Sequence, residues 1–250
     1  WYMEDQGEID AWFETSMPGE ATRSLFEAAK KYRIGFYLGF AEKVEEDGEV
    51  HRYNTSILVD PDGAVVGKYR KVHLPGHADF DPDRAFQHLE KRCFEIGNLG
   101  FPVWRTMGGV FGMCICNDRR WPEVYRVMGL KGVEMVLLGY NTPTTNSQSD
   151  EPARLRDFHN LLTMQAGAYQ NSTWVIGVAK AGNEDGHEMM GASAIIAPTG
   201  EVMSQCKTLG DELVVADCYL DACNFGNRTI FNFASHPSLH PYSLITAQTD

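Results

Sequence analysis

Residues 112–123 read GMCICNDRRWPE, a stretch in which a strand gives way to a helix. The apolar run that ends at Ile115 predicts a short buried strand, and Pro122 followed by Glu123 is typical of the first turn of a helix. Cys116 therefore occupies a strand-to-helix turn, which is a position suited to a nucleophile.

Positive groups surround this cysteine in the sequence. Arg119 and Arg120 follow Cys116 by three and four residues, and the backbone N–H groups of the helix start come next. Such surroundings favour the thiolate form of a cysteine, which is the nucleophilic form. A buried structural cysteine beside two surface arginines is the alternative, because free cysteines are among the most buried residues.

The composition restricts the class of protein. The 250 residues suit one large domain or two small ones, and the formal net charge of −12 argues against a general nucleic-acid binder or an anionic membrane surface. The chain has no apolar run long enough to span a membrane, no signal-peptide pattern, and only six cysteines. We therefore expect a cytoplasmic protein with reduced thiols.

The spacing of potential metal ligands is unfavourable. Cys114 and Cys116 alternate on a strand and point to opposite faces. Two histidine pairs are separated by four residues, but a proline interrupts each, so neither forms a helical ligand pair: His73 with His77, and His236 with His240. We therefore expect no structural metal.

Helical and strand-like patterns alternate along the chain without a low-complexity linker. We expect helices over residues 21–33, 121–131 and 155–171, and strands over 35–41, 53–60, 64–69, 110–115, 133–139, 173–179, 192–197, 201–206 and 213–218. Strands and helices mixed in this way, with hairpins at 61–63 and 198–200, indicate a layered α/β protein with a mixed sheet. Residues 231–250 have little pattern, as in an extended tail.

Four polar clusters follow one another in a specific order. They are KYRKVHLPG at 68–76, FQHLEKR at 86–92, CNDRRWPE at 116–123 and GYNTP at 139–143. Together with MQAG at 164–167 and APTGE at 197–201, this set resembles the nitrilase superfamily of carbon–nitrogen hydrolases. Within that superfamily the chain is most similar to the N-carbamoyl-D-amino acid amidohydrolases, over nearly its whole length.

The resemblance implies a four-layer α-β-β-α sandwich formed by a single domain over residues 1–250, with 231–250 as a C-terminal arm. It also implies that the reaction needs no metal or organic cofactor, and that chains pair through helices as a homodimer or homotetramer. The family's first strand, first helix and triad glutamate, which lies in a Phe-Pro-Glu type segment, match nothing in the chain. The resemblance places them upstream of Trp1, so we expect an N-terminally truncated domain.

The resemblance assigns three catalytic residues. Cys116 matches the nucleophile, Lys71 matches the triad lysine, and Glu90 matches a second family glutamate. The thiolate would attack a carbamoyl carbon and Lys71 would stabilise the oxyanion, while Glu90 would orient Lys71 or assist water. Taken singly, Lys71 reads as a surface lysine and Glu90 as part of a solvated charged run.

The resemblance also assigns substrate-binding residues. Arg119 and Arg120, with Asn141, match residues that hold the substrate, and arginine binds carboxylates in a bidentate fork. We therefore expect a small substrate that carries a carboxylate. One of the two arginines is expected to form only a structural ion pair.

Three further polar residues match the family's site. His73 and His88 correspond to histidines near the nucleophile, where they either shape the pocket or transfer protons. Asn117 either caps the following helix or lines the pocket.

The predicted reaction is hydrolysis of an N-carbamoyl-D-amino acid to the D-amino acid, ammonia and carbon dioxide. Two alternatives remain open from the sequence. One is a sibling hydrolase that acts on β-ureido acids, amides or nitriles, and the other is a non-catalytic subunit of the same fold. A thiol redox protein has little support, because the chain has no Cys-x-x-Cys.

Overall fold

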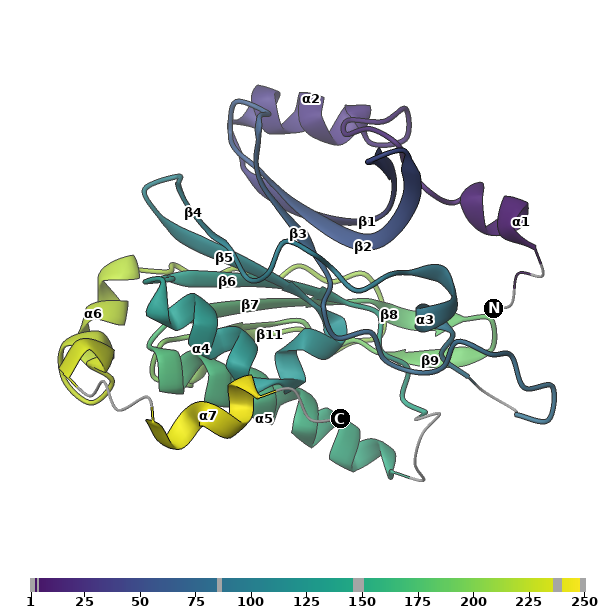
Figure 1. Cartoon of the computed structure of the whole chain (residues 1–250). Helices are drawn as coiled ribbons and strands as arrows, with labels where there is room; N and C mark the ends of the chain where they lie inside the picture. The colour runs from purple at the N-terminus through teal and green to yellow at the C-terminus, as the bar shows by residue number, and fades with distance from the viewer. Residues whose placement is uncertain (1–2, 4, 85–86, 146–150, 236–239, 248–250) are drawn as a thin grey trace.

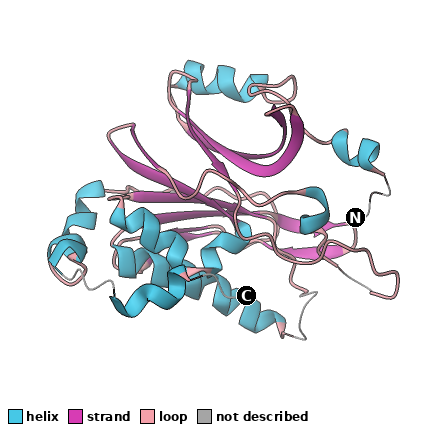
Figure 2. Ribbon diagram, in the orientation of Figure 1, coloured by secondary structure: helices cyan, strands magenta, loops and turns pink. Residues whose placement is uncertain are grey.

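The computed structural model describes residues 3, 5–84, 87–145, 151–235 and 240–247. Two β-sheets lie face to face, and helices cover their outer faces (Figure 1). Helix α2 (Arg23–Tyr32) covers the smaller sheet, while α4 (Pro122–Leu130) and α5 (Ala153–Asn171) cover the larger one (Figure 2). This arrangement confirms the predicted α-β-β-α sandwich.

The smaller sheet is an antiparallel meander. Its described strands are β1 (Phe36–Glu46), β2 (Glu49–Val59) and β3 (Val65–Arg70), in the order β1-β2-β3. The apolar spacing predicts this helix, but Leu25 and Tyr32 of the expected apolar row are exposed, and Phe26 packs onto Ile57 and Val59 instead. A short helix, α1 (Gln6–Asp10), precedes these elements.

The larger sheet is mixed. Its described strands, in spatial order, are β11 (Val202–Gln205), β10 (Ala194–Ile196), β7 (Trp174–Ala179), β6 (Met135–Tyr140), β5 (Gly109–Ile115) and β4 (Val103–Thr106). The central strands β5, β6 and β7 are parallel, and α4 and α5 make the crossovers between them. Cys116 and Asn141 follow β5 and β6 directly, so both emerge at the same edge of the sheet.

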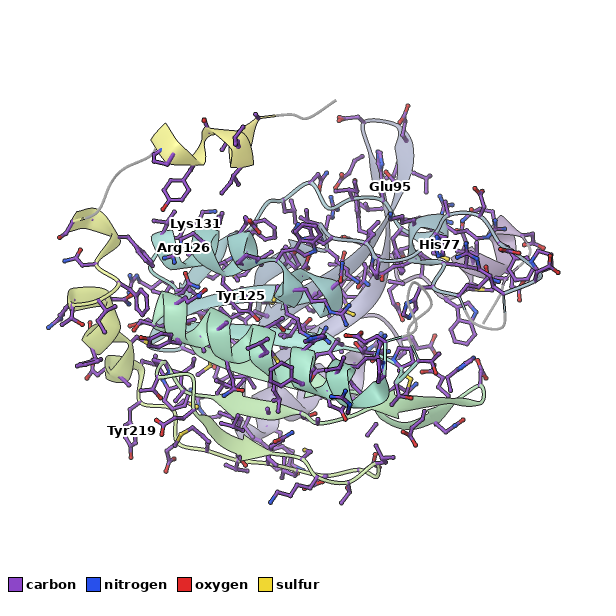
Figure 3. The ribbon with its side chains drawn as sticks, turned by 90° about the horizontal axis from the view of Figure 1, so that it is seen from below. His77, Glu95, Tyr125, Arg126, Lys131 and Tyr219 are labelled. Atoms are coloured by element: carbon purple, nitrogen blue, oxygen red, sulfur yellow. The ribbon has the colours of Figure 1, made fainter. Side chains whose placement is uncertain are left out.

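The core fills the space between the sheets and the space under α4 and α5. Met113 is fully buried between the two sheets, where it contacts Ser56, and Leu138, Met128 and Met164 are fully buried on the helical side. Tyr125 lies where α4 and α5 run side by side (Figure 3). A Cβ at Gly167 would come within 2.7 Å of the Tyr125 ring, so the glycine permits this close approach of the two helices.

One predicted strand is wrong. Residues 213–218 are extended, but they form no ladder with any described strand. Val214, Ala216 and Cys218 pack toward the Trp174 cluster, while Leu213 is 86% exposed. The alternation of apolar side chains identifies extended chain, but it says nothing about whether a neighbouring strand supplies hydrogen bonds.

Several elements escaped the sequence patterns. They are β4, the hairpin of β8 (Ala181–Glu184) and β9 (His187–Met190), the helix α3 (Glu90–Cys93) and the 3₁₀ helix η1 (Cys116–Arg120). All are four or five residues long, which is too short for a helical or alternating period to show. No helix in the described part of the chain is long and apolar enough to cross a membrane.

The C-terminal region contains short helical turns rather than an uninterrupted tail. Past residue 219 the described elements are η2 (Leu220–Ala222), α6 (Cys223–Arg228), η3 (Phe233–Ser235), η4 (His240–Tyr242) and α7 (Ser243–Thr246). Leu244 of α7 is 82% exposed. A role of residues 231–250 as an arm stays a prediction.

Candidate active site

A buried carboxylate holds the turn at Cys116. The Cys116 backbone has φ of 49°, a left-handed conformation that costs a residue other than glycine of the order of 1–3 kcal/mol. Asp118 Oδ2 accepts hydrogen bonds from Ile115 N (3.0 Å) and Tyr69 OH (2.7 Å), and Oδ1 accepts from His73 N (3.0 Å). Because Asp118 is fully buried, these bonds fix the turn against solvent competition.

Sequence reasoning did not assign a role to Asp118. Its signal was an aspartate two residues beyond the cysteine, within the first turn of a helical segment, where a carboxylate can accept backbone N–H groups. The long-range partners of Asp118, Tyr69 and His73, come from the end of β3 and from the segment after it. The side chain therefore joins the nucleophile turn to the lysine-bearing segment.

Lys71 is buried and paired with Glu90. It is 1% exposed and follows β3, and its Nζ lies 2.5 Å from Glu90 Oε1. Asn54 Nδ2 donates to the same oxygen at 2.8 Å. A buried lysine needs such a partner, so the two residues support each other, as the combined sequence pattern predicts.

These groups line one cavity between the sheets. It has a volume of about 1100 Å³, and its polar lining includes Lys71, Glu90, Cys116 and Asn141. Apolar residues of both sheets form most of the remaining wall. The fold thus brings the predicted nucleophile, lysine, second glutamate and asparagine onto the same space from four separate segments.

Arg119 holds the backbone of Cys116. It is 1% exposed, its guanidinium stacks 4.2 Å from the centre of the Tyr140 ring, and its Nη1 donates to Cys116 O at 2.7 Å. Its Nε donates to Asn160 Oδ1 at 3.0 Å and its Nη2 to Thr142 Oγ1 at 3.4 Å. The donors of Arg119 are thus directed at protein groups.

Arg120 has a different environment. Arg120 is exposed. Partial desolvation of its guanidinium and the positive charge of the neighbouring Arg119 lower the pKa of Arg120. Arg156, on α5, is 3% exposed. Its desolvation is the main cause that lowers its pKa, and the positive charge of Arg120 is the second. Sequence reasoning missed Arg156, because an arginine in a charged helical turn normally lies in solvent.

His73 and Asn117 are fixed by the protein. The His73 ring stacks on Trp121 at 4.7 Å between ring centres, and its Nδ1 lies 2.9 Å from Asp118 Oδ1. Asn117 Nδ2 donates to the His73 carbonyl at 3.2 Å. Asn117 does not cap α4, because Trp121 occupies the N-cap position.

His88 is half-buried among cations. Desolvation, with the charges of Arg156 and Lys71, lowers its pKa to about 4, so the imidazole is neutral at pH 7. His77 N donates to the His88 carbonyl at 2.8 Å, and Figure 3 shows His77 on the loop that follows β3. A Cβ at Gly76, where φ is 80°, would come within 2.1 Å of that carbonyl, so the loop requires glycine there.

Replacing His88 by glutamine is expected to reduce the loss of stability in mild acid. The folded pKa of about 4 lies below the ordinary value of 6.5, so the unfolded chain binds more protons between these values. In the parent protein, protonation of His88 should therefore lower the free energy of unfolding by about 2–3 kcal/mol between pH 7 and pH 4.5. The H88Q variant should not show this part of the decrease. Urea unfolding at both pH values measures it.

His51 provides a control of opposite sign. The Glu95 carboxylate raises the pKa of His51, so His51 stabilises the folded state as the pH falls. The H51Q variant should lose more stability than the parent over the same pH range. Equal pH dependence in the parent and H88Q would contradict the assignment of His88.

Acidic and metal-ligating side chains are few among the described residues of this region. Glu90 is the one acidic side chain among the described residues that line it. Across the described ranges, no group of three or more His, Cys, Asp or Glu side chains is arranged to hold a metal. His236, one of the histidines considered above, lies outside the described residues.

The sequence of the chain matches a known protein family. The carbon-nitrogen hydrolase family model matches residues 4–225. A nitrilase of Pyrococcus abyssi is 32% identical over 204 residues, covering 81% of this chain and 66% of its own length. An N-carbamoylputrescine amidase of Arabidopsis thaliana is 30% identical over 184 residues, covering 70% of this chain and 58% of its own length.

The fold is also found among solved structures. A carbon-nitrogen hydrolase from Helicobacter pylori superposes with a TM-score of 0.76 at 23% identity, covering 92% of this chain and 77% of that one. The chain spans between about half and two thirds of the length of the first curated relatives that it matches. The chain belongs to the carbon-nitrogen hydrolase family.

Proposed function

We propose that the protein is a hydrolase that cleaves N-carbamoyl-D-amino acids by cysteine covalent catalysis. The observation that carries this proposal is the meeting of Cys116, Lys71 and Glu90 on the wall of one cavity. The carbamoyl group is a weak electrophile, so a covalent intermediate divides one difficult step into two. The family membership supports attack on a carbon–nitrogen bond.

Each residue has a role in this proposal. Cys116 Sγ attacks the carbamoyl carbon, and Lys71 Nζ donates to the resulting oxyanion. Ammonia leaves as the carbon–nitrogen bond breaks, and water then cleaves the carbamoyl thioester, which yields carbon dioxide and the free amino acid. Glu90 keeps Lys71 oriented for this task.

The thiol proton needs an acceptor that later protonates the departing ammonia. The resemblance assigns this role to a glutamate that matches no residue of the chain. Glu90 already accepts hydrogen bonds from Lys71 and Asn54, so we retain the proposal that a separate glutamate serves as the base.

Two features support the proposed substrate: the first bears on its carbamoyl group and the second on its carboxylate. An N-carbamoylputrescine amidase is among the relatives of the chain. Arg120 and Asn141 lie beside the nucleophile in the fold, and we propose that they contact the substrate. We propose that His73, Asn117 and His88 shape the pocket, and that Arg119 serves the nucleophile turn.

The full-length gene product is expected to release ammonia from N-carbamoyl-D-phenylalanine and to leave the L enantiomer nearly untouched. If arginine contacts fix the carboxylate of the substrate and the pocket accepts the substrate's side chain in one direction only, the position of the carbamoyl group depends on the configuration at the α-carbon. Only one enantiomer then presents its carbamoyl carbon to Cys116. An ammonia assay on both enantiomers measures this selectivity.

Other results would favour the alternatives. Equal rates on both enantiomers, or faster turnover of a simple aliphatic amide, would identify a sibling amidase. Absence of turnover with carbamoyl, amide and nitrile substrates would identify a non-catalytic member of the fold.

We also propose that the protein acts in the cytoplasm as a homodimer or homotetramer. Phe158, Leu162 and Tyr169 form an apolar row on the outer face of α5, and they are 58%, 46% and 46% exposed. Exposed apolar rows of this kind favour association. Light scattering of the purified protein gives the mass that tests it.

A further inference from the structure

Arg156 is a buried cation without a carboxylate partner in the described part of the chain. Its side chain is 3% exposed, and its Nε is buried without a hydrogen-bond acceptor. No described acidic group lies within ion-pair distance of its guanidinium. A buried charge in such a position is costly, because no ion pair among the described residues compensates its desolvation.

The fold directs this cation at the nucleophile turn. Helix α5 packs against η1, the 3₁₀ helix that carries Cys116 and Arg120. Arg156 lies within electrostatic range of Arg120 and of the Cys116 sulfur. The negative charge of Glu151 acts on both Arg120 and Arg156 and raises their pKa values. Glu151 Oε1 itself lies 2.5 Å from His159 Nδ1.

Arg119 does not share this availability. Its guanidinium donates to Cys116 O, Asn160 and Thr142, all of them neutral acceptors within the protein. If Arg119 gave up these hydrogen bonds to bind a ligand, the Cys116 carbonyl would lose its hydrogen bond from Arg119. Lys71 is paired with Glu90, so Arg120 and Arg156 are the described arginines near Cys116 that remain for an anion.

We propose that Arg120 and Arg156 together form the receptor for the carboxylate of the substrate, while Arg119 positions the nucleophile. The inference rests on the proposed function, because it names the group that recognises the substrate of the same site. Two arginines from different elements present forked donors to one carboxylate. The anion supplies the hydrogen-bond acceptor that Arg156 Nε lacks.

The receptor predicts a selective effect of R156Q. Its kcat/KM for N-carbamoyl-D-phenylalanine should fall roughly 10- to 100-fold, the range for losing a hydrogen-bonded charge partner. Its kcat/KM for phenethylurea, the same molecule without the carboxylate, should change less than threefold. R120Q should show the same selective loss, and R156K should recover part of it, because lysine restores the charge without the fork.

R154Q is the matched control. Arg154 lies on the same helix two residues away, but its side chain is exposed. This variant removes the same charge from the helix and should keep the parental preference for the acid over phenethylurea. An equal loss on both substrates in R156Q, or the same selective loss in R154Q, would overturn the receptor. If R156Q does not fold, R156K and R120Q decide the question.

A binding measurement separates this inference from the reaction itself. Titration calorimetry of N-carbamoyl-D-phenylalanine into C116A reports the receptor without turnover. C116A should bind the acid, and C116A/R156Q should bind it roughly 10- to 100-fold more weakly. Absence of turnover in the parent, with this difference intact, would reject the proposed reaction and keep the receptor. Equal affinities would reject the receptor.

Discussion

Replacing Cys116 by alanine is expected to abolish turnover while the fold and substrate binding persist. The substitution removes the sulfur that forms the covalent intermediate, and losses of a nucleophile typically lower kcat by roughly 10³- to 10⁶-fold. The side chain lines the cavity at the edge of the hydrophobic core, and its polar contact, at 3.8 Å from Thr142 Oγ1, is a weak one. Stability should therefore change little. Steady-state ammonia release and the unfolding midpoint measure the two effects.

Cys114 supplies the matched control for this variant. It lies two residues earlier on β5, is fully buried, and burial raises its pKa well above the ordinary range. C114A should remain active and lose stability, because it leaves a small gap in the core. Residual turnover of C116A within tenfold of the parent would contradict the nucleophile assignment.

Replacing Asp118 by asparagine is expected to have the largest effect on stability. The buried carboxylate accepts from Ile115 N, Tyr69 OH and His73 N, and an amide turns one acceptor into a donor facing these donors. We expect a loss of about 3–5 kcal/mol in the free energy of unfolding. Activity should fall further than the folded fraction, because the Cys116 turn depends on the same bonds.

Chemical denaturation and kcat at a temperature where D118N stays folded check this result. Asp60 is the comparison, since its carboxylate accepts from Asp62 N and Ala64 N in an exposed turn. D60N should lose no more than about 1 kcal/mol, the usual net value of such a hydrogen bond. A D118N protein as stable and active as D60N would contradict the role of Asp118.

The layered fold follows from the sequence because its long elements have clear periods. Helix α5 shows both the strength and the limit of such patterns. Its spacing predicts a helix, but Phe158 and Leu162 of its apolar row lie on the outer face, while Arg156 and Asn160 are buried. The end of α5 near Cys116 contacts Arg119, and Asn160 of this end accepts a hydrogen bond from Arg119 Nε. The buried face of α5 is therefore polar there and not apolar.

The environments of the paired arginines could not be predicted from their spacing. Arg119 and Arg120 are adjacent, but on a 3₁₀ helix with three residues per turn they point about 120° apart. One is therefore buried against Tyr140 and the other reaches the surface. Arg156 is distant in sequence, and only the packing of α5 on η1 brings it to the site.

Capture of the covalent intermediate tests the central claim most directly. The full-length gene product is mixed with N-carbamoyl-D-phenylalanine, quenched in acid during turnover, digested and analysed by mass spectrometry with fragmentation. The account predicts a carbamoyl-type adduct on Cys116, none on Cys114, and none in C116A. Turnover with no adduct on Cys116, or with the adduct on another cysteine, would contradict it.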